Sequence, residues 1–232
     1  DRIGFLELVP YGLILLLIVG LMMLEPHMSG TILILAGAAA VLFAAGIKLY
    51  WFAGGGAALM GLVVLMMSGY QSTRILVWQD PWAYPRDGGY QIIQCLYAIG
   101  SGGLLGLGLG KSRQKFLYLP EPENDFIFAI VCEELGLIGA GIVLILFALL
   151  VMRGYWIAIH ARDRFGALLV VGITTLTAVQ VFLNISVVTN LIPTTGISLP
   201  FFSYGGTALM IQLAEMGIIL SVSRQIPAPR QE

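Results

Sequence analysis

The chain has 232 residues, a formal net charge of −1 and a mean hydropathy of +0.91, and 58% of its residues are hydrophobic against 11% charged. This composition excludes an ordinary soluble domain, and the long apolar blocks predict an all-α polytopic membrane protein surrounded by lipid. The near-zero charge and the lack of a basic tract argue against nucleic acid as a partner. The chain starts at Asp1 without a charged-then-apolar leader, so we expect the numbering to begin inside a longer chain.

Six apolar blocks are long enough, or nearly so, to cross a bilayer as helices. They are residues 9–24, 31–47, 51–68, 126–152, 165–188 and 204–222. The first two blocks are slightly shorter than the ~20 residues that a vertical span needs, so a re-entrant pair around Glu25, Pro26 and His27 is the alternative to two true spans. Of these alternatives we favour two true spans.

The blocks divide the chain into segments that alternate across the membrane. Residues 1–68 hold three spans, 69–125 form a large extracytoplasmic loop, 126–223 hold three spans with an outer loop at 189–203, and 224–232 form a cytoplasmic tail. If the spans alternate, the Lys and Arg residues of the short loops fall on one side, which the positive-inside rule makes cytoplasmic. These residues are Arg2, Lys48, Arg153, Arg162, Arg164, Arg224 and Arg230. Both ends of the chain are then expected in the cytoplasm.

The large loop contains more than a linker. Its turn-forming runs DPWAYPRDGG and LPEPEN flank a half-apolar stretch, 90–105, which we expect to form a short helix that lies on the membrane or dips into it. The glycine run GSGGLLGLGLG, residues 100–110, looks superficially like a phosphate-binding loop. Because it lacks Walker spacing and follows no predicted strand, we interpret it as flexible or close-packed backbone.

Asp125 is the leading catalytic candidate because it stands where the acidic, proline-broken loop meets a membrane-length helix. Lys111, Arg113 and Lys115 precede it by a few residues on the same predicted outer face. A carboxylate can take a proton from an attacking hydroxyl, and nearby cations can neutralise a phosphate or pyrophosphate leaving group. The alternative for the three cations is contact with anionic lipid headgroups.

The acidic residues inside the predicted spans have a different expected role. At ~1.5 Å per residue, Glu133 and Glu134 lie about 12 to 14 Å deeper than Asp125, too far to form a carboxylate pair with it. We expect both to be structural anchors of the helix that presents Asp125, and structural use is also favoured for Glu215. The cysteines, Cys95 and Cys132, are too few for a disulfide framework and are expected to be small packing residues.

The predicted span 165–188 carries a polar stripe at helical spacing. Its members are Thr177, Gln180 and Asn184, with Ser186 and Asn190 following. Interhelical hydrogen bonding and a substrate groove both explain such a stripe. The next segment, LIPTTGISLPFFSYGG, contains two prolines and cannot be one continuous helix. Non-helical backbone at membrane depth must be buried in protein or line a cavity, so we expect this segment to wall an outer pocket.

Four segments of the sequence resemble motifs of the SEDS family (shape, elongation, division and sporulation), and they follow one another in the same order. The family comprises the membrane glycan polymerases RodA, FtsW and SpoVE. LPEPENDFIFAIVCEELG resembles the signature LPE…TDFIFA…EE.G, and IPTTGISLPFFSYGGTALM resembles LPT.G..LP..SYGG. DPWAYPRDGGYQIIQ and LEPHMSGT are similar to the DP…GYQ…Q segment and the QPD.GT turn. GLGLGKSRQKFLYLP looks more like the division and sporulation branches than the elongation branch. The chain departs from the pattern at Asn124, where Thr is usual, and at His27, where Asp is usual.

The resemblance implies a ten-helix fold, of which the six spans here would be the last six. It also implies an outer-face active site that polymerises lipid II into peptidoglycan beside a class B penicillin-binding protein, a transpeptidase. The family's essential outer aspartate falls on Asp125. As candidate substrate-binding residues we name Lys111, Arg113, Lys115, Arg74, Gln114 and Ser203. A divalent cation, Mg²⁺ or Mn²⁺, could share the charge neutralisation, but no ligand spacing in the sequence assigns a metal site.

The sequence therefore favours a peptidoglycan glycosyltransferase that acts at the outer face of the bacterial cytoplasmic membrane during division or sporulation. Two other classes of function stay open. A transporter or flippase of the same lipid would use Glu133, Glu134 and Glu215 inside the membrane. A non-enzymatic scaffold for the transpeptidase would not need Asp125 for cell growth.

Overall fold

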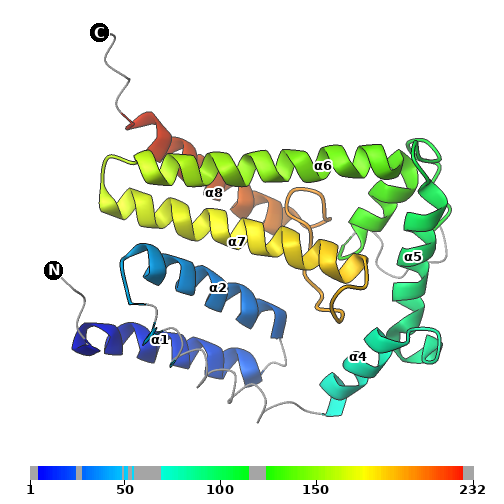
Figure 1. The fold of residues 1–232 in the computed structure, drawn as a ribbon, viewed down its shortest axis with the longest axis horizontal. Helices are drawn as coiled ribbons and strands as arrows, with labels where there is room; N and C mark the ends of the chain where they lie inside the picture. Colours follow the sequence, from blue (N-terminus) through cyan, green and yellow to red (C-terminus); the bar gives the residue numbers. More distant parts are fainter. Residues whose placement is uncertain are drawn as a thin grey trace, which may run out of the picture. The chain divides into compact units, whose positions relative to one another are not determined.

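A computed structural model of the chain describes residues 5–24, 28–48, 50–51, 54, 69–114 and 124–226. Over these ranges the protein is helical and contains no strand, which confirms the all-α prediction (Figure 1). The helices are α1 (Phe5–Leu24), α2 (Met28–Ala44), α4 (Gly69–Gln79), a short π-helix η1 (Pro85–Gly89), α5 (Tyr90–Gly102), α6 (Ile127–His160), α7 (Arg164–Val188) and α8 (Gly206–Arg224).

Five of the predicted spans coincide with helices, namely α1, α2, α6, α7 and α8. Three of them, α6 to α8, are long and apolar enough to cross a membrane, whereas the apolar parts of α1 and α2 are shorter. The predicted span 51–68 falls almost entirely outside the described residues, as does the 25–27 turn, so the count of six stays a prediction. Helix α6 runs past its predicted end at residue 152, because Ile157 and Ala158 pack into a core with α7 and α8.

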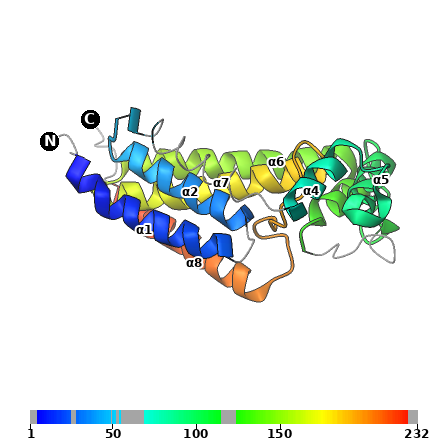
Figure 2. The ribbon, with the colours of Figure 1, turned by 90° about the horizontal axis from the view of Figure 1, so that it is seen from below.

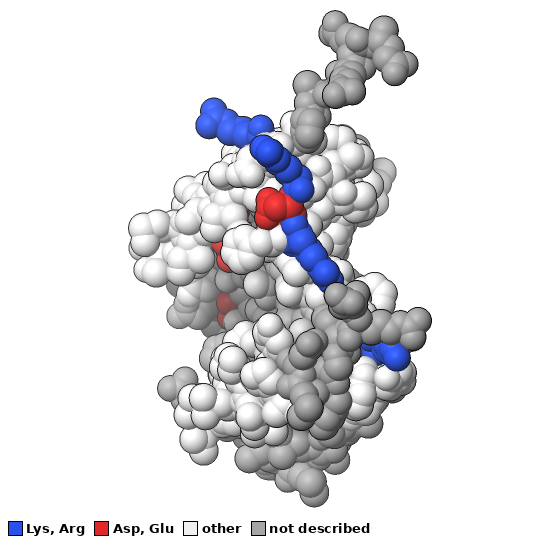
Figure 3. Space-filling model, turned by 90° about the vertical axis from the view of Figure 1, so that its left-hand side faces the viewer, with Lys and Arg blue, Asp and Glu red and all other residues white. Residues whose placement is uncertain are grey.

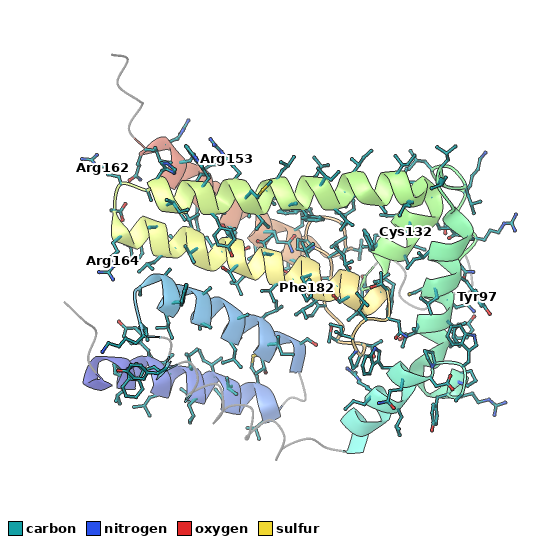
Figure 4. The ribbon with its side chains drawn as sticks, viewed as in Figure 1. Tyr97, Cys132, Arg153, Arg162, Arg164 and Phe182 are labelled. Carbon is teal, nitrogen blue, oxygen red and sulfur yellow. The ribbon has the colours of Figure 1, made fainter. Side chains whose placement is uncertain are left out.

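In the described part of the large predicted loop, two α-helices form, α4 and α5, together with the short π-helix η1. Helix α5 lies within the stretch where a short helix was expected, and it buries Ile92, Cys95 and Ala98 while Tyr97 projects outward (Figure 4). Helix α4 was not anticipated, because its polar first half interrupts the apolar pattern. Between them the backbone turns so tightly that a side chain at Gly89 would collide with the Pro81 carbonyl oxygen, which only glycine avoids.

The chain forms two compact units, which divide first between Met67 and Ser68, beside the predicted start of the large loop. The predicted boundaries at 125 and 223 lie within units, and the topological segments stay predictions. Unit 1 contains Asp1–Met67, Val151–Val179 and Leu213–Glu232, and unit 2 contains Ser68–Leu150 and Gln180–Gln212. Helices α6, α7 and α8 each contribute to both units. Unit 2 thus gathers the segments that the sequence assigns to the outer face, including Asp125 and all the described candidate site residues.

In unit 1, small residues let helices pack closely. Helices α1 and α2 run side by side in both views (Figure 1 and Figure 2). The Leu176 side chain of α7 lies against the backbone of α2 at Gly37, and Val41 of α2 lies 3.0 Å from where a Cβ on Gly172 would stand. Small residues are typical of such contacts between membrane helices, because they let backbones approach.

Unit 1 also exposes a basic end where α6 passes into α7. Arg153, Arg162 and Arg164 lie there, and basic side chains gather on this face (Figure 3 and Figure 4). The Arg164 guanidinium donates to the Ala45 carbonyl oxygen just after α2 at 2.6 Å, and the Asp163 carboxylate accepts from the Gly166 N–H at 2.7 Å, which caps α7. These are residues of the side that the positive-inside rule makes cytoplasmic.

Candidate functional site

Helix α6 is interrupted at Gly136, and the loop that follows α5 in unit 2 enters this break. Gly136 has φ 67° and ψ −170°, so the helix stops and restarts there. In an unbroken helix the N–H groups of Leu137 and Ile138 would bond back to the carbonyls of Glu133 and Glu134. Here they donate instead to Gly103 (2.9 Å) and Leu104 (3.2 Å).

The carbonyls of Glu133 and Glu134, which lose their helical donors at the break, accept hydrogen bonds from the loop that follows α5. The Glu133 carbonyl oxygen accepts from the Leu107 N–H, and that of Glu134 accepts from the Gly108 N–H, each at 3.0 Å. The glycine-rich segment after α5 is therefore inserted into the helix break and replaces one turn of helical hydrogen bonds. This arrangement satisfies every one of these four backbone groups in a segment that packs against an apolar helix.

The insertion explains close packing at two glycines of the run and at Gly136. A side chain on Gly102 would collide with the Cys132 carbonyl oxygen, and one on Gly106 would collide with that of Glu134. A side chain on Gly136 would collide with the backbone nitrogen of Gly106. Backbone approaches backbone at all three positions, so no rotamer change could make room for a Cβ.

The cationic segment 111–114 is fixed by the next part of the same loop. The Glu133 carboxylate accepts a short hydrogen bond from the Ser112 hydroxyl and further bonds from the N–H groups of Arg113 (3.0 Å) and Gln114 (3.4 Å). One Glu134 oxygen accepts from the Ser112 N–H at 3.4 Å. The acidic pair is structural, as expected, but it anchors the cationic segment rather than only the helix that presents Asp125.

Asp125 lies in the turn that leads into α6 and is half-buried. Its backbone carbonyl accepts a 2.8 Å bond from the Asn184 side-chain amide, which also donates to the Ile197 carbonyl at 2.7 Å. One Asp125 carboxylate oxygen lies 3.6 Å from where a Cβ on Gly196 would stand, and Gly196 has φ 71°. Asn184, itself only 1% exposed, thus ties the catalytic candidate to the loop that follows α7.

That loop, residues 189–205, is held by polar side chains of the neighbouring helices. Gln180 on α7 donates to the Ser198 carbonyl at 3.1 Å, and Gln212 on α8 accepts from the Phe201 N–H at 2.8 Å. Phe201 has φ 64°, a strained value that this bond helps to maintain. Gln180 and Asn184 of the stripe on α7 therefore supply hydrogen bonds to the non-helical backbone of this loop.

Arg74 and Ser203 also form hydrogen bonds with the backbone of this loop. The Arg74 guanidinium donates to the Thr194 carbonyl oxygen at 3.1 Å, and the Ser203 hydroxyl oxygen accepts from the Leu199 N–H at 2.7 Å. Trp78, on the same helix as Arg74, donates to the Asn190 carbonyl at 3.1 Å and so fixes the start of the loop. Both candidate residues therefore bond to the backbone of the loop that contains Gly196, the residue beside the Asp125 carboxylate.

The structure separates the candidate residues into two groups. Asp125 and Arg74 lie against the 189–205 loop, which contains Ser203, whereas Lys111, Arg113 and Gln114 lie beside Glu133. At ~1.5 Å per residue, Glu133 is about 9 Å along α6 from its first residue, Ile127. Lys115 lies outside the described residues.

The remaining polar and reactive groups are candidates for metal ligands or nucleophiles. Within the ranges that the structure describes, no three His, Cys, Asp or Glu side chains are placed to hold a metal ion. Burial raises the pKa of the Cys95 thiol to about 12, so this thiol stays protonated near neutral pH. For Asn184 and Glu133, the sequence did not identify the groups that they bind. The available signal was a polar side chain within an apolar helical run, which marks such a position without naming its partner.

Comparison with known proteins agrees with this architecture. The family model described as "Cell cycle protein", covering FtsW, RodA and SpoVE, matches residues 4–227. The chain belongs to this family. It is 49% identical over 206 residues to Stage V sporulation protein E of Bacillus subtilis, covering 88% of this chain and 56% of that protein. It is 43% identical over 219 residues to a probable peptidoglycan glycosyltransferase, FtsW, of a Geobacter species, covering 94% and 60%.

Solved structures place this FtsW/RodA/SpoVE family member in the same fold. A chain from a structure on the coordination of polymerization and crosslinking by a peptidoglycan synthase complex superposes with a TM-score of 0.77 at 29% identity, covering 98% of this chain and 64% of that one. The rod shape determining protein RodA of Thermus thermophilus superposes with a TM-score of 0.60 at 29% identity, covering 94% and 56%. The chain thus spans about three-fifths of the length of these relatives, and it is a membrane protein of the SEDS fold.

Removing the Asn184 amide should disturb Asp125 without touching its carboxylate. In the full-length protein, Asn184→Ala leaves the Asp125 and Ile197 carbonyls without a donor, at a cost of ~1–3 kcal/mol for each buried group. On the hypothesis that the full-length protein is a glycosyltransferase, we expect its reaction rate to fall about 10- to 100-fold. Thr177→Ala is the matched control, since the Thr177 hydroxyl bonds only its own helix, at the Ile173 carbonyl. Equal rates for the two variants would contradict the role given to Asn184.

Proposed function

We propose that the full-length protein is a peptidoglycan glycosyltransferase that polymerises lipid II into glycan strands at the outer face of the cytoplasmic membrane. The observation that carries the proposal is a half-buried carboxylate, Asp125, held beside a hydrogen-bonded loop in the same compact unit as an anchored cationic segment. The glycosyltransferase names of the relatives support this class of reaction. Sequence similarity to sporulation and division proteins supports a role in one of those processes.

In the proposed step, the Asp125 carboxylate takes the proton of the acceptor sugar hydroxyl. The hydroxyl oxygen then attacks the anomeric carbon of the donor sugar, and a new glycosidic C–O bond forms there. The bond from this carbon to the pyrophosphate breaks, and its electron pair leaves with the polyprenyl pyrophosphate. Positive charge near the departing phosphates lowers the barrier, because negative charge grows on them in the transition state.

The side chains of Lys111 and Arg113 are proposed to supply this positive charge. Both are exposed, and the backbone that carries them is fixed by Glu133. Lys115 is proposed to join them. Gln114, Arg74 and Ser203 are also proposed to contact the sugars or phosphates. A divalent cation, Mg²⁺ or Mn²⁺, is compatible with the chemistry, but the described residues do not converge on a site for one.

The proposed setting follows from charge and from the relatives. The basic end of unit 1 would face the cytoplasm together with both ends of the chain, and Asp125 would face outward. The six spans would be the last six of a ten-helix protein. The solved complex for polymerization and crosslinking supports a cross-linking partner, and we propose a class B penicillin-binding protein.

A reconstituted assay tests the proposal against its rivals. The full-length protein is placed in vesicles that carry lipid II in the leaflet facing Asp125, and both glycan length and lipid translocation are measured. We expect glycan strands without net translocation. Translocation without polymer would favour a flippase. Neither activity, together with intact transpeptidase binding and normal growth of an Asp125→Ala strain, would favour a scaffold.

A further inference from the structure

Glu133 has an environment that simple packing does not explain. Its side chain is 1% exposed, and a carboxylate that leaves water is costly unless hydrogen bonds replace its hydration. Its two oxygens accept from the Ser112 hydroxyl and from the N–H groups of Arg113 and Gln114. All of these donors belong to one short segment of the loop, so the carboxylate is specific for that segment.

The residues that immediately precede this segment are held by the backbone of α6. The carbonyls of Glu133 and Glu134 accept from Leu107 and Gly108, just before the cations. Gly108 and Gly110 have φ values of 103° and 75°, which direct the chain from the helix break back to the Glu133 carboxylate. Lys111 lies between the backbone attachment and the carboxylate attachment, and Arg113 lies within the second. The side chains of both residues are exposed.

We propose that Glu133 is a positioning residue that holds the 111–114 backbone so that Lys111 and Arg113 face the pyrophosphate of the lipid-linked substrate. The inference rests on the proposed function and adds to it the group that sets the geometry of the cations. A fixed backbone reduces the ordering cost that flexible cationic side chains impose on binding. Glutamine could not replace the carboxylate, because its NH₂ group would take the place of one acceptor oxygen. That group would face either the Arg113 N–H or the Gln114 N–H and the Ser112 hydroxyl.

The test uses the full-length protein with Glu133→Gln, Ser112→Ala and Glu134→Gln. Two quantities are measured: the KM and kcat for lipid II, and the Kd for a polyprenyl pyrophosphate beside that for the uncharged polyprenol. For Glu133→Gln we expect KM and the pyrophosphate Kd to rise about 10- to 100-fold and polyprenol binding to stay unchanged. The kcat should fall as well, because the displaced cations would also stabilise the departing pyrophosphate less. Ser112→Ala should shift KM in the same direction but less, because two Glu133 hydrogen bonds remain. Glu134→Gln should shift it least, because only one 3.4 Å bond is affected.

Several results would overturn the inference. An unchanged KM and pyrophosphate Kd in Glu133→Gln would do so, as would an equal loss of pyrophosphate and polyprenol binding, which indicates general damage. If Glu133→Gln does not accumulate, Ser112→Ala decides, and a wild-type KM in that variant counts against the inference. A wild-type protein that neither polymerises lipid II nor binds the pyrophosphate would instead overturn the proposed function, and the inference with it.

Discussion

Replacing Asp125 with Asn in the full-length protein should lower the rate of lipid II polymerisation by about 100- to 10,000-fold, the range that a general base contributes. The two side chains have the same shape, so the Asn184 bond to the backbone at this position should persist. What the variant loses is the group that accepts a proton from the acceptor hydroxyl. The rate is measured from labelled lipid II by separating the glycan strands on a gel.

Asp80→Asn is the matched control for that experiment. Asp80 is an exposed carboxylate of the same unit, and it accepts a 3.2 Å bond from the Ala83 N–H in a turn. We expect this variant to polymerise at close to the wild-type rate. Polymerisation by Asp125→Asn at the rate of Asp80→Asn would remove Asp125 from the mechanism.

Gly136→Ala should have the largest effect on folding. The backbone there has φ 67° and ψ −170°, a region that is essentially restricted to glycine, and a Cβ would collide with the Gly106 backbone. To relieve the collision, the loop would have to leave the helix break and give up the hydrogen bonds at Leu107, Gly108, Leu137 and Ile138. We expect a loss of about 3 kcal/mol or more in the free energy of unfolding. The measurement is the thermal midpoint of the purified protein.

Gly141→Ala on the same helix is the control, because no atom lies within 4 Å of the Cβ it would add. Alanine also favours a helix over glycine by about 1 kcal/mol, so this variant should be as stable as the wild type or slightly more so. A thermal midpoint for Gly136→Ala that equals that of Gly141→Ala would contradict the inserted-loop account.

The helices were largely predictable from the sequence, because lipid-facing helices must be apolar over their whole length. That constraint marks α6, α7 and α8 clearly. It fails for α4, whose polar residues include Arg74, and it misplaces the end of α6, where contacts with α7 and α8 sustain the helix beyond its apolar run. Tertiary contacts decide both cases, and hydropathy alone carries no information about them.

The site was predictable only in part for a similar reason. The junction of loop and helix at Asp125 can be recognised locally, since a carboxylate at a membrane boundary has few structural uses. The role of Glu133 depends on Ser112 and Arg113, which are about twenty residues away and meet it only because the loop enters the break at Gly136. The glycine run gave a hint of close packing, but nothing local identifies which backbone it approaches.

The central claim is that two carboxylates of one sequence motif have different roles. Asp125 takes the proton of the acceptor hydroxyl, and Glu133 positions the cations. Equilibrium binding of lipid II to the Asp125→Asn protein tests it most directly. The account predicts a Kd close to that of the wild type in a protein that makes no glycan, since the cationic segment is held independently of Asp125. A Kd that rises as steeply as the polymerisation rate falls would contradict it.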